Sequence, residues 1–248
     1  IASFDIECNS IDGQFPQAKR LGDKIIQIGT TYTRLGESIP FRQHIVCLKE
    51  TNEVSGAIVE SYNNEKDLIK GWLDEINNSD CDILTGYNIF YFDEKYIYDR
   101  SKLLGIETDV SYLSKLNGFR CPFKKIKLAS SALGENLLRY YDTPGMIHLD
   151  LMKEVQKSPD KMESYKLDKV AGYYLKGDIN CIKKYKPKKY DNLYLLECPK
   201  VKDIYKDDYI HLEQQVGFIS DDIGYKFKIK NIKDNNLIIE SDIDLTKE

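Results

Sequence analysis

The feature that most constrains the fold is a change of hydrophobic period in the middle of the chain. Residues 81–87 (CDILTGY) form a short apolar run that predicts a buried strand, and residues 92–104 then carry apolar side chains at helical spacing. Residues 1–7, 24–34 and 41–48 come earlier, are rich in β-branched or alternating apolar residues, and each predict a strand. Strands followed by a strand–helix alternation are typical of an α/β layer. We therefore predict an α/β fold with a mixed sheet and flanking helices.

Three further segments have helical spacing. Residues 64–77 carry it most clearly, and their first residue is an asparagine that can cap the helix. Residues 149–156 and 164–175 predict two more helices, and we expect the second to end at Gly177. Between these parts, residues 118–141 predict an inserted hairpin that carries a group of basic side chains. The group consists of Arg120, Lys124, Lys125 and Lys127.

The character of the sequence changes near residue 183, where the stretch KKYKPKKY gives way to short apolar segments separated by turn residues. The apolar segments are 217–220, 225–229 and 237–240, with turn residues at 221–224 and 234–236. We therefore predict two domains, an α/β domain over residues 1–182 and a small β module over residues 183–248. The basic stretch either follows a phosphate backbone or forms a solvated face.

Composition excludes several classes of protein. No apolar run approaches the roughly 20 residues that a membrane-spanning helix needs, and no basic start precedes an apolar stretch, so we expect neither a membrane protein nor a secreted one. The six cysteines include no Cys-x-x-Cys pair, which favours reduced thiols over a disulfide framework or a zinc knuckle. A net charge of −4 argues against coating nucleic acid by bulk electrostatics, but leaves open an acidic site that holds cations.

The opening strand carries two acidic side chains, Asp5 and Glu7. Because side chains alternate along a strand, residues two apart point to the same face. Two like charges at close range are costly unless a cation neutralises them. The pair therefore indicates either a cation site or the ordinary polar face of an edge strand.

A second group of polar residues follows the strand at 81–87. Gly86 ends that strand, and Asn88 and Asp93 lie in the turn that leads into the next helix. The sheets of α/β proteins expose their sites at such strand ends. The alternative is that Asn88 is a turn residue and that Asp93 only favours the N-terminus of the helix.

Together the two groups resemble a known family. The pattern Asp-x-Glu on the opening strand, followed by Tyr-Asn-x-x-x-Phe-Asp at residues 87–93, is similar to the first two exonuclease motifs of the family B DNA polymerases. The resemblance covers residues 1–177, and its order and spacing are similar to the polymerase-delta-like branch of eukaryotes and large DNA viruses. The segments that carry it are SFDIEC at 3–8, DKIIQIG at 23–29, DILTGYNIFYFD at 82–93, SSALGEN at 130–136, PGMIHLDLM at 144–152 and SYKLDKVA at 164–171.

The resemblance implies a 3′–5′ proofreading exonuclease of ribonuclease-H-like fold. Magnesium prefers oxygen ligands, and two such ions about 4 Å apart can hydrolyse a phosphodiester. The complete site would hold two Mg²⁺ or Mn²⁺ ions, bound by the catalytic residues Asp5, Glu7 and Asp93. Its partners would be the single-stranded 3′ end of primer DNA and the remainder of the polymerase polypeptide. The protein would act where DNA is replicated, in the nucleus or in a cytoplasmic virus factory.

The resemblance also implies which residues touch DNA. Asn88 and Phe92 would contact the unpaired 3′ end, with Phe92 packing on a base or sugar. Tyr87 is the third residue of this set, although an aromatic beside a site often belongs to the core. His148 and Asp150 lie in a segment that is mainly structural in the family, so neither is predicted to be catalytic.

The sequence departs from the family pattern at the third exonuclease motif, Tyr-x-x-x-Asp. The formal match that begins at Tyr174 and ends at Asp178 is rejected because Gly177 would end the helix between them. The stretch from Tyr209 to Glu213 has a longer acid and is predicted to be β. We expect the third motif and the polymerase domains to lie outside this chain, which would leave it weak or inactive alone. The alternatives are a non-catalytic module that binds single-stranded nucleic acid, or a separate exonuclease of the same superfamily.

Overall fold

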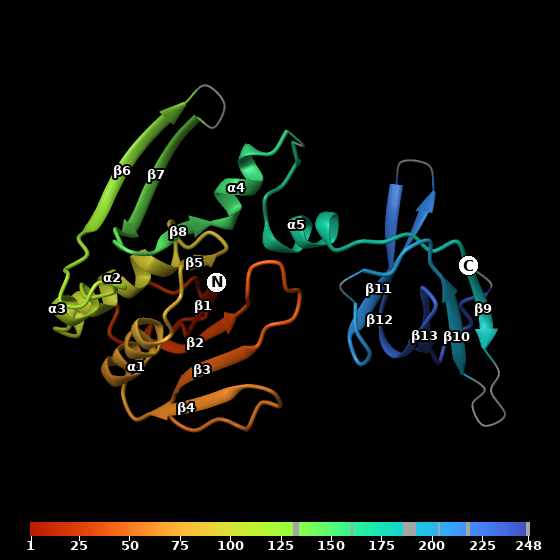
Figure 1. Ribbon diagram of the computed structural model, residues 1–248, viewed down its shortest axis with the longest axis horizontal. Coiled ribbons are helices and arrows are strands. Elements are labelled where there is room, and N and C mark those ends of the chain that lie inside the picture. The colour runs from red at the N-terminus through yellow and green to blue at the C-terminus, as the bar shows by residue number, and fades with distance from the viewer. Residues whose placement is uncertain (131–133, 160, 186–191, 203, 217–218, 247–248) are drawn as a thin grey trace. The chain divides into compact units, whose positions relative to one another are not determined.

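The computed structural model describes the chain except residues 131–133, 160, 186–191, 203, 217–218 and 247–248. The described residues form two compact units, residues 1–167 and residues 168–248 (Figure 1). Each unit has its own hydrophobic core, so the two are described separately.

The first unit is built on a six-stranded mixed sheet with the strand order β4-β3-β2-β1-β5-β8. The pairs β1–β2 and β2–β3 are antiparallel, whereas β3–β4, β1–β5 and β5–β8 are parallel. The strands are β1 (Ala2–Cys8), β2 (Ile25–Tyr32), β3 (Arg42–Leu48), β4 (Ile58–Tyr62), β5 (Ile83–Gly86) and β8 (Ile147–Asp150). The prediction of an α/β fold with a mixed sheet is confirmed, and the arrangement is consistent with a ribonuclease-H-like fold.

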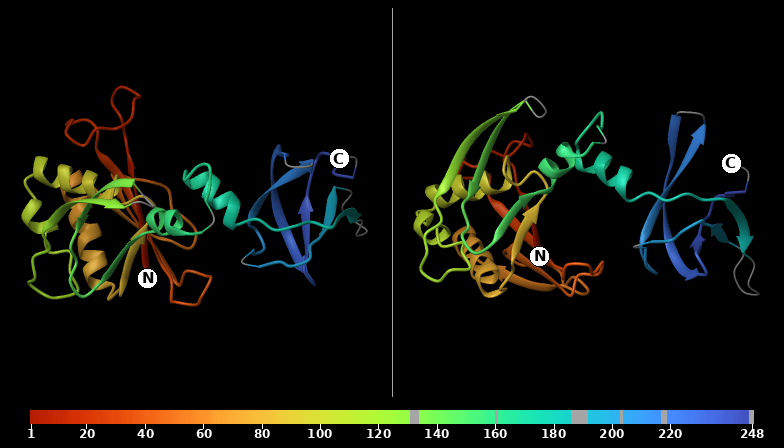
Figure 2. Two further views of the ribbon diagram at one scale, coloured as in Figure 1. Left: turned by 90° about the horizontal axis from the view of Figure 1, so that it is seen from above. Right: turned by 45° about the horizontal axis from the view of Figure 1, so that its top comes forward.

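Helices and one hairpin complete this unit. The hairpin pairs β6 (Phe123–Ser130) with β7 (Gly134–Tyr141), as the sequence predicts. In the left view of Figure 2, the loop between β1 and β2 stands out from the sheet. In the right view, the β6–β7 hairpin does. The helices are α1 (Glu65–Asn78), α2 (Asp93–Leu103), α3 (Glu107–Val110) and α4 (Leu151–Lys157), and α5 (Leu167–Tyr174) begins at the end of the unit.

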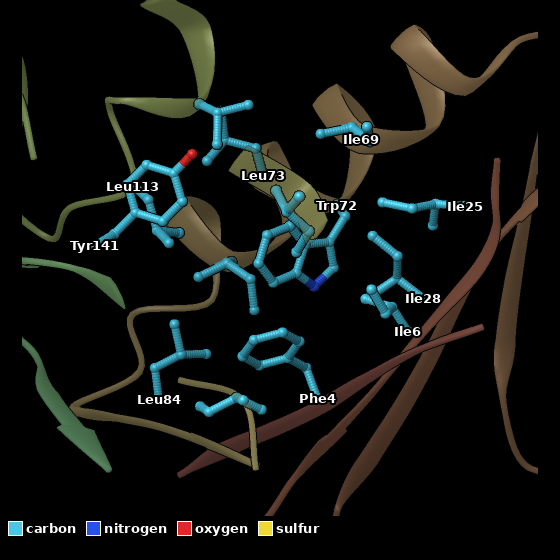
Figure 3. Packing of buried hydrophobic residues seen from close by; sticks show 14 of the residues in the cluster. Phe4, Ile6, Ile25, Ile28, Ile69, Trp72, Leu73, Leu84, Leu113 and Tyr141 are labelled. Carbon is cyan, nitrogen blue, oxygen red and sulfur yellow. The ribbon is translucent and has the colours of Figure 1, made fainter. Parts of the chain in front are cut away.

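The core of the first unit lies between the sheet and α1. Trp72, on α1, is 1% exposed, and its ring centroid lies 5.0 Å from that of Phe4 on β1 (Figure 3). Its indole N–H donates a hydrogen bond to Thr30 Oγ1 at 3.2 Å, so the polar atom of this large side chain is satisfied inside the core. Because Phe4 and Ile6 point into this core, the residues between and after them on β1 point the other way.

The second unit contains a five-stranded antiparallel sheet with the order β11-β12-β13-β10-β9. This confirms the predicted small β module as a separate antiparallel sheet. The strands are β9 (Cys181–Tyr185), β10 (Leu193–Glu197), β11 (Tyr209–Val216), β12 (Ile219–Lys233) and β13 (Asn236–Glu240). The predicted turn at 234–236 joins β12 to β13, where Asp234 and Asn235 have φ values of 49° and 60°.

Several predictions of local structure are wrong. The predicted turn at residues 221–224 lies inside β12, where Asp221 and Asp222 pair with β11 instead of ending the strand. Strands β4 and β8 were not predicted, and residues 149–150 belong to β8, so that α4 begins only at Leu151.

The helix that was predicted to end at Gly177 ends at Tyr174, where Leu175 N donates to Ala171 O. Asp178 therefore lies outside the helix, and Tyr174 and Asp178 do not share a helical face. The physical reason given from the sequence was wrong, but rejection of this match stands.

Two of the basic or motif segments fall partly outside the described residues: the stretch KKYKPKKY at 183–190 and the segment SSALGEN at 130–136. The six cysteines are free thiols, as predicted. Within the described part of the chain, no helix is both long and apolar enough to cross a membrane.

Candidate active site

Asp5 and Glu7 lie on the face of β1 that points away from the core. The burial pattern along this strand alternates, with Phe4 and Ile6 buried and the two acids exposed, so the prediction that both carboxylates share one face is confirmed. The parallel pairing of β1 with β5 ends at Ser3 and Thr85. Asp5 therefore lies just beyond the paired residues, where the chain leaves β5 and turns toward α2.

Asp93 is the first residue of α2 and is 2% exposed. Its Oδ1 accepts a hydrogen bond from the backbone N–H of Ile6 at 3.1 Å, which ties the start of α2 to β1. Its carboxyl group also lies within hydrogen-bonding reach of the Asp5 carboxyl. The structure thus brings together Asp5 and Asp93, although they are far apart in the sequence.

Glu7 is not part of a closed group with these two acids. Across the described residues, no three His, Cys, Asp or Glu side chains are grouped so that they could hold one metal ion. The three-acid ligand set with Glu7 therefore stays a prediction, and the structure supports a pair.

The pair of aspartates is electrostatically unusual. Burial and the negative charge of Asp5 together raise the pKa of Asp93 to about 7, although the hydrogen bond from Ile6 acts in the opposite direction. The pKa of Asp5 is raised because surrounding atoms displace water from it, although its hydrogen bond with Asp93 lowers it. The two groups therefore compete for a proton near neutral pH, because ionising both places two negative charges side by side.

This pair fits a divalent cation with oxygen ligands. Magnesium is typically bound by one or two carboxylates together with substrate phosphates and water. A cation would take the place of the shared proton and would compensate the charge of both groups. The observed donor set therefore accounts for one ion.

The turn between β5 and α2 is held in place by a close backbone approach and by Asp150. A Cβ atom on Gly86 would lie 2.5 Å from the Phe4 carbonyl oxygen, so the end of β5 can approach β1 only without a side chain. Asp150 Oδ1 accepts from Asn88 N at 2.9 Å, and Oδ2 accepts from Phe90 N at 3.1 Å. Asp150 thus has the structural role expected from the sequence: it fixes the turn that carries Asn88.

Asn88 itself has a backbone φ of 63°, in the left-handed region that asparagine tolerates better than most residues. Its side-chain Oδ1 is buried and has no hydrogen-bond partner among the described residues. A buried polar atom without a partner is costly, which indicates that a ligand group or water completes it. Tyr87 differs, because its hydroxyl donates to the Tyr165 carbonyl at 2.6 Å and so is used within the fold.

Phe92 lies beside an aromatic cavity. Its ring packs on Tyr96 at 5.4 Å and on Phe15 at 5.3 Å between centroids. Phe15 is 72% exposed and belongs to the loop between β1 and β2. The cavity beside these rings has a volume of about 310 Å³. Its lining includes Phe15, Lys19, Tyr91, Phe92, Lys95 and Arg139.

The contribution of Phe15, Lys19 and Arg139 to this cavity was not predicted from the sequence. The glycines and proline of residues 12–23 indicated only a loop, and the aromatic residue inside it was the one signal that could have been used. Arg139 lies on β7 and its guanidinium is 5.7 Å from the centre of the Tyr91 ring. Nothing in the sequence indicated that β7 would approach this turn.

The loop that carries Phe15 is fastened to the core by a buried ion pair. Arg100 is 1% exposed, and its Nε donates to Glu65 Oε1 at 2.7 Å, with a second contact from Nη2 to Oε2. Its Nη1 donates to the carbonyls of Ala18 and Arg20 at 3.0 and 2.6 Å. The fork geometry of the guanidinium thus links α2, α1 and the loop.

The basic group on the hairpin is partly neutralised within the fold. Lys124 pairs with Asp142, and Lys127 pairs with Glu135 at 2.8 Å. These ion pairs reduce the positive charge that the group offers to phosphates. DNA contact by this group stays a prediction.

Comparison with known proteins identifies the family. The family described as "DNA polymerase family B, exonuclease domain" matches residues 1–170. The chain belongs to this family. It is 37% identical over 223 residues to a DNA polymerase of Pyramimonas orientalis virus, which covers 90% of this chain and 17% of that protein. It is 32% identical over 175 residues to the DNA polymerase delta catalytic subunit of Schizosaccharomyces pombe, which covers 71% of this chain and 16% of that protein.

The resemblance predicted from the motifs is therefore confirmed for the family B exonuclease domain and for its viral and polymerase-delta relatives. The chain spans 16–17% of the length of these two relatives, so each is a much larger polypeptide. The first unit contains residues 1–167. The 223-residue match to the viral polymerase must therefore extend well into the second unit.

Proposed function

We propose that this chain is the 3′–5′ proofreading exonuclease part of a longer family B DNA polymerase polypeptide that acts at sites of DNA replication, in the nucleus or in a cytoplasmic virus factory. The observation that carries the proposal is the contact between Asp5 and Asp93 at the ends of β1 and the β5–α2 turn. A buried carboxylate such as that of Asp93 is normally matched by cations or N–H donors, and the neighbouring charge of Asp5 instead raises the electrostatic cost of burying it. The proposed reaction is hydrolysis of the 3′-terminal phosphodiester of single-stranded DNA.

Asp5 and Asp93 would hold Mg²⁺ or Mn²⁺, and the ion would supply Lewis-acid stabilisation of negative charge on the phosphate. Glu7 is proposed as a further ligand, which would serve a second ion in the complete site. The backbone N–H of Ile6 holds the Asp93 carboxylate in place at 3.1 Å. Because α2 begins at Asp93, the positive end of the helix dipole favours negative charge at this point.

The DNA end would be held by the residues around the β5–α2 turn. The unpartnered Oδ1 of Asn88 is available to accept a hydrogen bond from a nucleotide. Phe92 and the exposed Phe15 present aromatic surface on which a base can stack, a contact worth about 1–3 kcal/mol per base. Lys19 and Arg139 provide positive charge beside that cavity for phosphates. Tyr87 would support the turn from its other side, through Tyr165.

The second unit is proposed to be an inserted module shared with polymerases of large viruses, because the match to the viral relative extends into it. The domain boundary between residues 182 and 183 stays a prediction.

A second candidate function is a module that binds single-stranded 3′ ends without cutting them. It is favoured by one observation, that the described residues contain no three-acid metal group. A separate exonuclease of the same superfamily is less consistent with a match of residues 1–170 to the exonuclease domain of DNA polymerases.

The test compares two polypeptides, the 248-residue chain and the longer polymerase polypeptide that continues through a Tyr-x-x-x-Asp motif. Release of mononucleotides from a 3′-labelled oligonucleotide is measured with Mg²⁺, with Mn²⁺ and with EDTA. We expect slow or absent release by the 248-residue chain and rapid, ion-dependent release by the longer one, because loss of one water-orienting group commonly costs about 10²–10⁴ in rate. Asp93→Asn should abolish the activity. The matched control Asp82→Asn, an exposed acid of the same unit, should not.

Two results would decide against the proposal. If neither polypeptide releases nucleotides but both bind the oligonucleotide in an anisotropy titration, the binding module is the better description. If Asp93→Asn keeps full ion-dependent activity, the pair is not the site.

A further inference from the structure

A closed ring of polar contacts joins the first turn of α2 to the stem of the β6–β7 hairpin. Glu94 Oε2 accepts a hydrogen bond from Tyr141 N at 2.7 Å, and Glu94 Oε1 lies 2.7 Å from His148 Nε2. His148 Nδ1 in turn lies 3.1 Å from the Tyr141 carbonyl oxygen. Glu94 is 1% exposed and Tyr141 is 2% exposed, so the ring is formed away from water.

The chemistry of this ring fixes the orientation of its members. The Tyr141 carbonyl can only accept, so His148 Nδ1 must carry the proton in that contact. The remaining ring nitrogen then faces the Glu94 carboxyl group as an ion-pair contact, which is short but not aligned as a hydrogen bond. Both backbone polar groups of Tyr141 are therefore satisfied by the side chains of Glu94 and His148.

The ring lies next to the residues proposed to act on DNA. Glu94 directly follows Asp93, and the same strand β7 makes a second contact nearby, where Arg139 N donates to Phe90 O at 3.0 Å. The hairpin stem is thus fastened at two points to the segment that contains Asn88, Phe92 and Asp93. His148 belongs to β8, whose last residue, Asp150, accepts the N–H groups of Asn88 and Phe90.

A buried pair of ionisable side chains adds little to stability, because apolar residues of similar volume at the same positions are often at least as stabilising. Buried polar groups that face one another at short distance, in contrast, restrict the geometry of the segments that carry them. We propose that Glu94 and His148 are positioning residues of the exonuclease site. They fix the register of the β5–α2 turn and the start of α2 against the hairpin stem. This inference rests on the proposed exonuclease function, and neither residue touches substrate.

The consequence is that the hairpin stem and Asp93 are mechanically coupled. If the ring is broken, β7 can shift relative to α2, and the Asp93 carboxylate loses its fixed distance to Asp5. A misplacement of about 1 Å can reduce a rate by about 10²-fold without loss of binding. The signature of the ring is therefore a fall in kcat with little change in KM.

The test uses the full polymerase polypeptide and measures kcat and KM for nucleotide release from a single-stranded oligonucleotide with Mg²⁺. His148→Ala and Glu94→Ala should each lower kcat by about 10- to 100-fold. Glu94→Gln should keep kcat within about threefold of the unchanged protein, because its amide carbonyl can accept from Tyr141 N and its NH₂ can donate to a neutral His148. Polymerase activity of the same samples reports whether each variant is folded.

The matched control is His44→Ala. His44 is also a buried histidine, 1% exposed, and contacts the Glu60 carboxylate at 3.4 Å, but it lies on β3 toward the opposite edge of the sheet. We expect its loss to leave exonuclease kcat unchanged. Hydrogen exchange of the amide of Tyr141 gives a second measurement, and His148→Ala should accelerate it.

The outcomes separate the two proposals. If the unchanged polypeptide releases no nucleotides, the proposed function is wrong, whatever the variants do. If it is active and His148→Ala keeps kcat, or His44→Ala lowers it equally, the positioning role is wrong. The same conclusion follows if Glu94→Gln is as impaired as Glu94→Ala, or if exchange at Tyr141 is unaffected.

Discussion

Replacing Asp93 with asparagine should stabilise the metal-free chain at neutral and alkaline pH. Burial and the charge of Asp5 raise the pKa of Asp93 from 3.8 to about 7. A carboxyl group whose pKa is higher in the folded state binds its proton more tightly there. The folded state therefore loses stability as the pH rises from about 4 to about 7. Asparagine keeps an oxygen that can accept from Ile6 N, carries no charge and can donate its amide to Asp5.

The size of this effect follows from the shift. A tenfold change in an acid dissociation constant corresponds to about 1.4 kcal/mol, so ionising Asp93 costs at most about 4 kcal/mol of unfolding free energy. About 3 kcal/mol of that loss falls between pH 5 and pH 8. Because the two carboxyl groups titrate together, this loss of unfolding free energy belongs to the pair of Asp5 and Asp93 and not to Asp93 alone. In a unit of this size it corresponds to a fall of roughly 6–12 °C in Tm.

Trp72 provides a selective probe, because it is the one tryptophan of the chain and is buried in the core of the first unit. Urea unfolding followed by its fluorescence, in EDTA at pH 5 to 8, should show the unchanged chain losing stability while Asp93→Asn loses about 3 kcal/mol less. Asp82→Asn, whose carboxylate is exposed and paired with Lys115, should follow the unchanged chain. Mg²⁺ should restore stability at pH 8 to the unchanged chain and not to Asp93→Asn. Equal pH dependence in the unchanged chain and Asp93→Asn would refute the electrostatic reasoning.

Three further substitutions test how the site is held, each by urea unfolding followed at the same tryptophan. Arg100→Leu leaves Glu65 as an uncompensated buried charge and should cost about 3–5 kcal/mol, and a loss below 1 kcal/mol would contradict the importance of this pair. Gly86→Ala places a Cβ atom 2.5 Å from the Phe4 carbonyl and should cost about 1–3 kcal/mol, whereas a stabilised variant would show that the strand end can move freely. Asp150→Ala leaves three backbone N–H groups without their acceptor and should cost at least about 2 kcal/mol, and a neutral change would mean that water replaces the carboxylate.

The elements that could be predicted from the sequence are those with a local signal. Helix α1 is an example, since its apolar side chains recur at helical spacing and Asn64 caps it by accepting from Asp67 N at 2.9 Å. β1 is another, because alternation places Phe4 and Ile6 in the core and the acids outside. In both cases the information lies within a few residues of sequence.

Elements without such a signal could not be predicted. β8 has four residues, only the last of which is buried, so neither periodicity nor an apolar run marks it, and it becomes a strand by pairing with β5. β12 shows the reverse error, because Asp221, Asp222 and Gly224 have the composition of a turn. Asp221 and Asp222 nevertheless pair with β11, so long-range pairing overrides the local preference at these two residues, whereas Gly224 has a φ of 79° where the register shifts.

The site, like the fold, was predictable only where the sequence carries a local signal. The motif resemblance predicted that Asp5 and Asp93 would meet, and the structure brings them together. Phe15 and Glu94 were missed because their roles depend on which distant strand or helix lies opposite them. The closed group with Glu7 stays a prediction, since nothing in the described residues forms it.

The buried acids of the first unit give a means of separating structural carboxylates from a functional one. Four of them are matched by donors that lower the cost of burying a charge, either backbone N–H groups or a cationic side chain. These matched acids are Asp23, Glu65, Glu94 and Asp150. Asp93 is equally buried and accepts from backbone N–H groups, those of Ile6 and of Asp93 itself, but among the described residues it also lies against a like-charged side chain, Asp5. Folding alone would not favour that arrangement, because an apolar residue or an asparagine at position 93 would be more stable there. The contact between two acidic side chains is therefore the reason to place the proposed chemistry at Asp5 and Asp93 and not at the other buried acids.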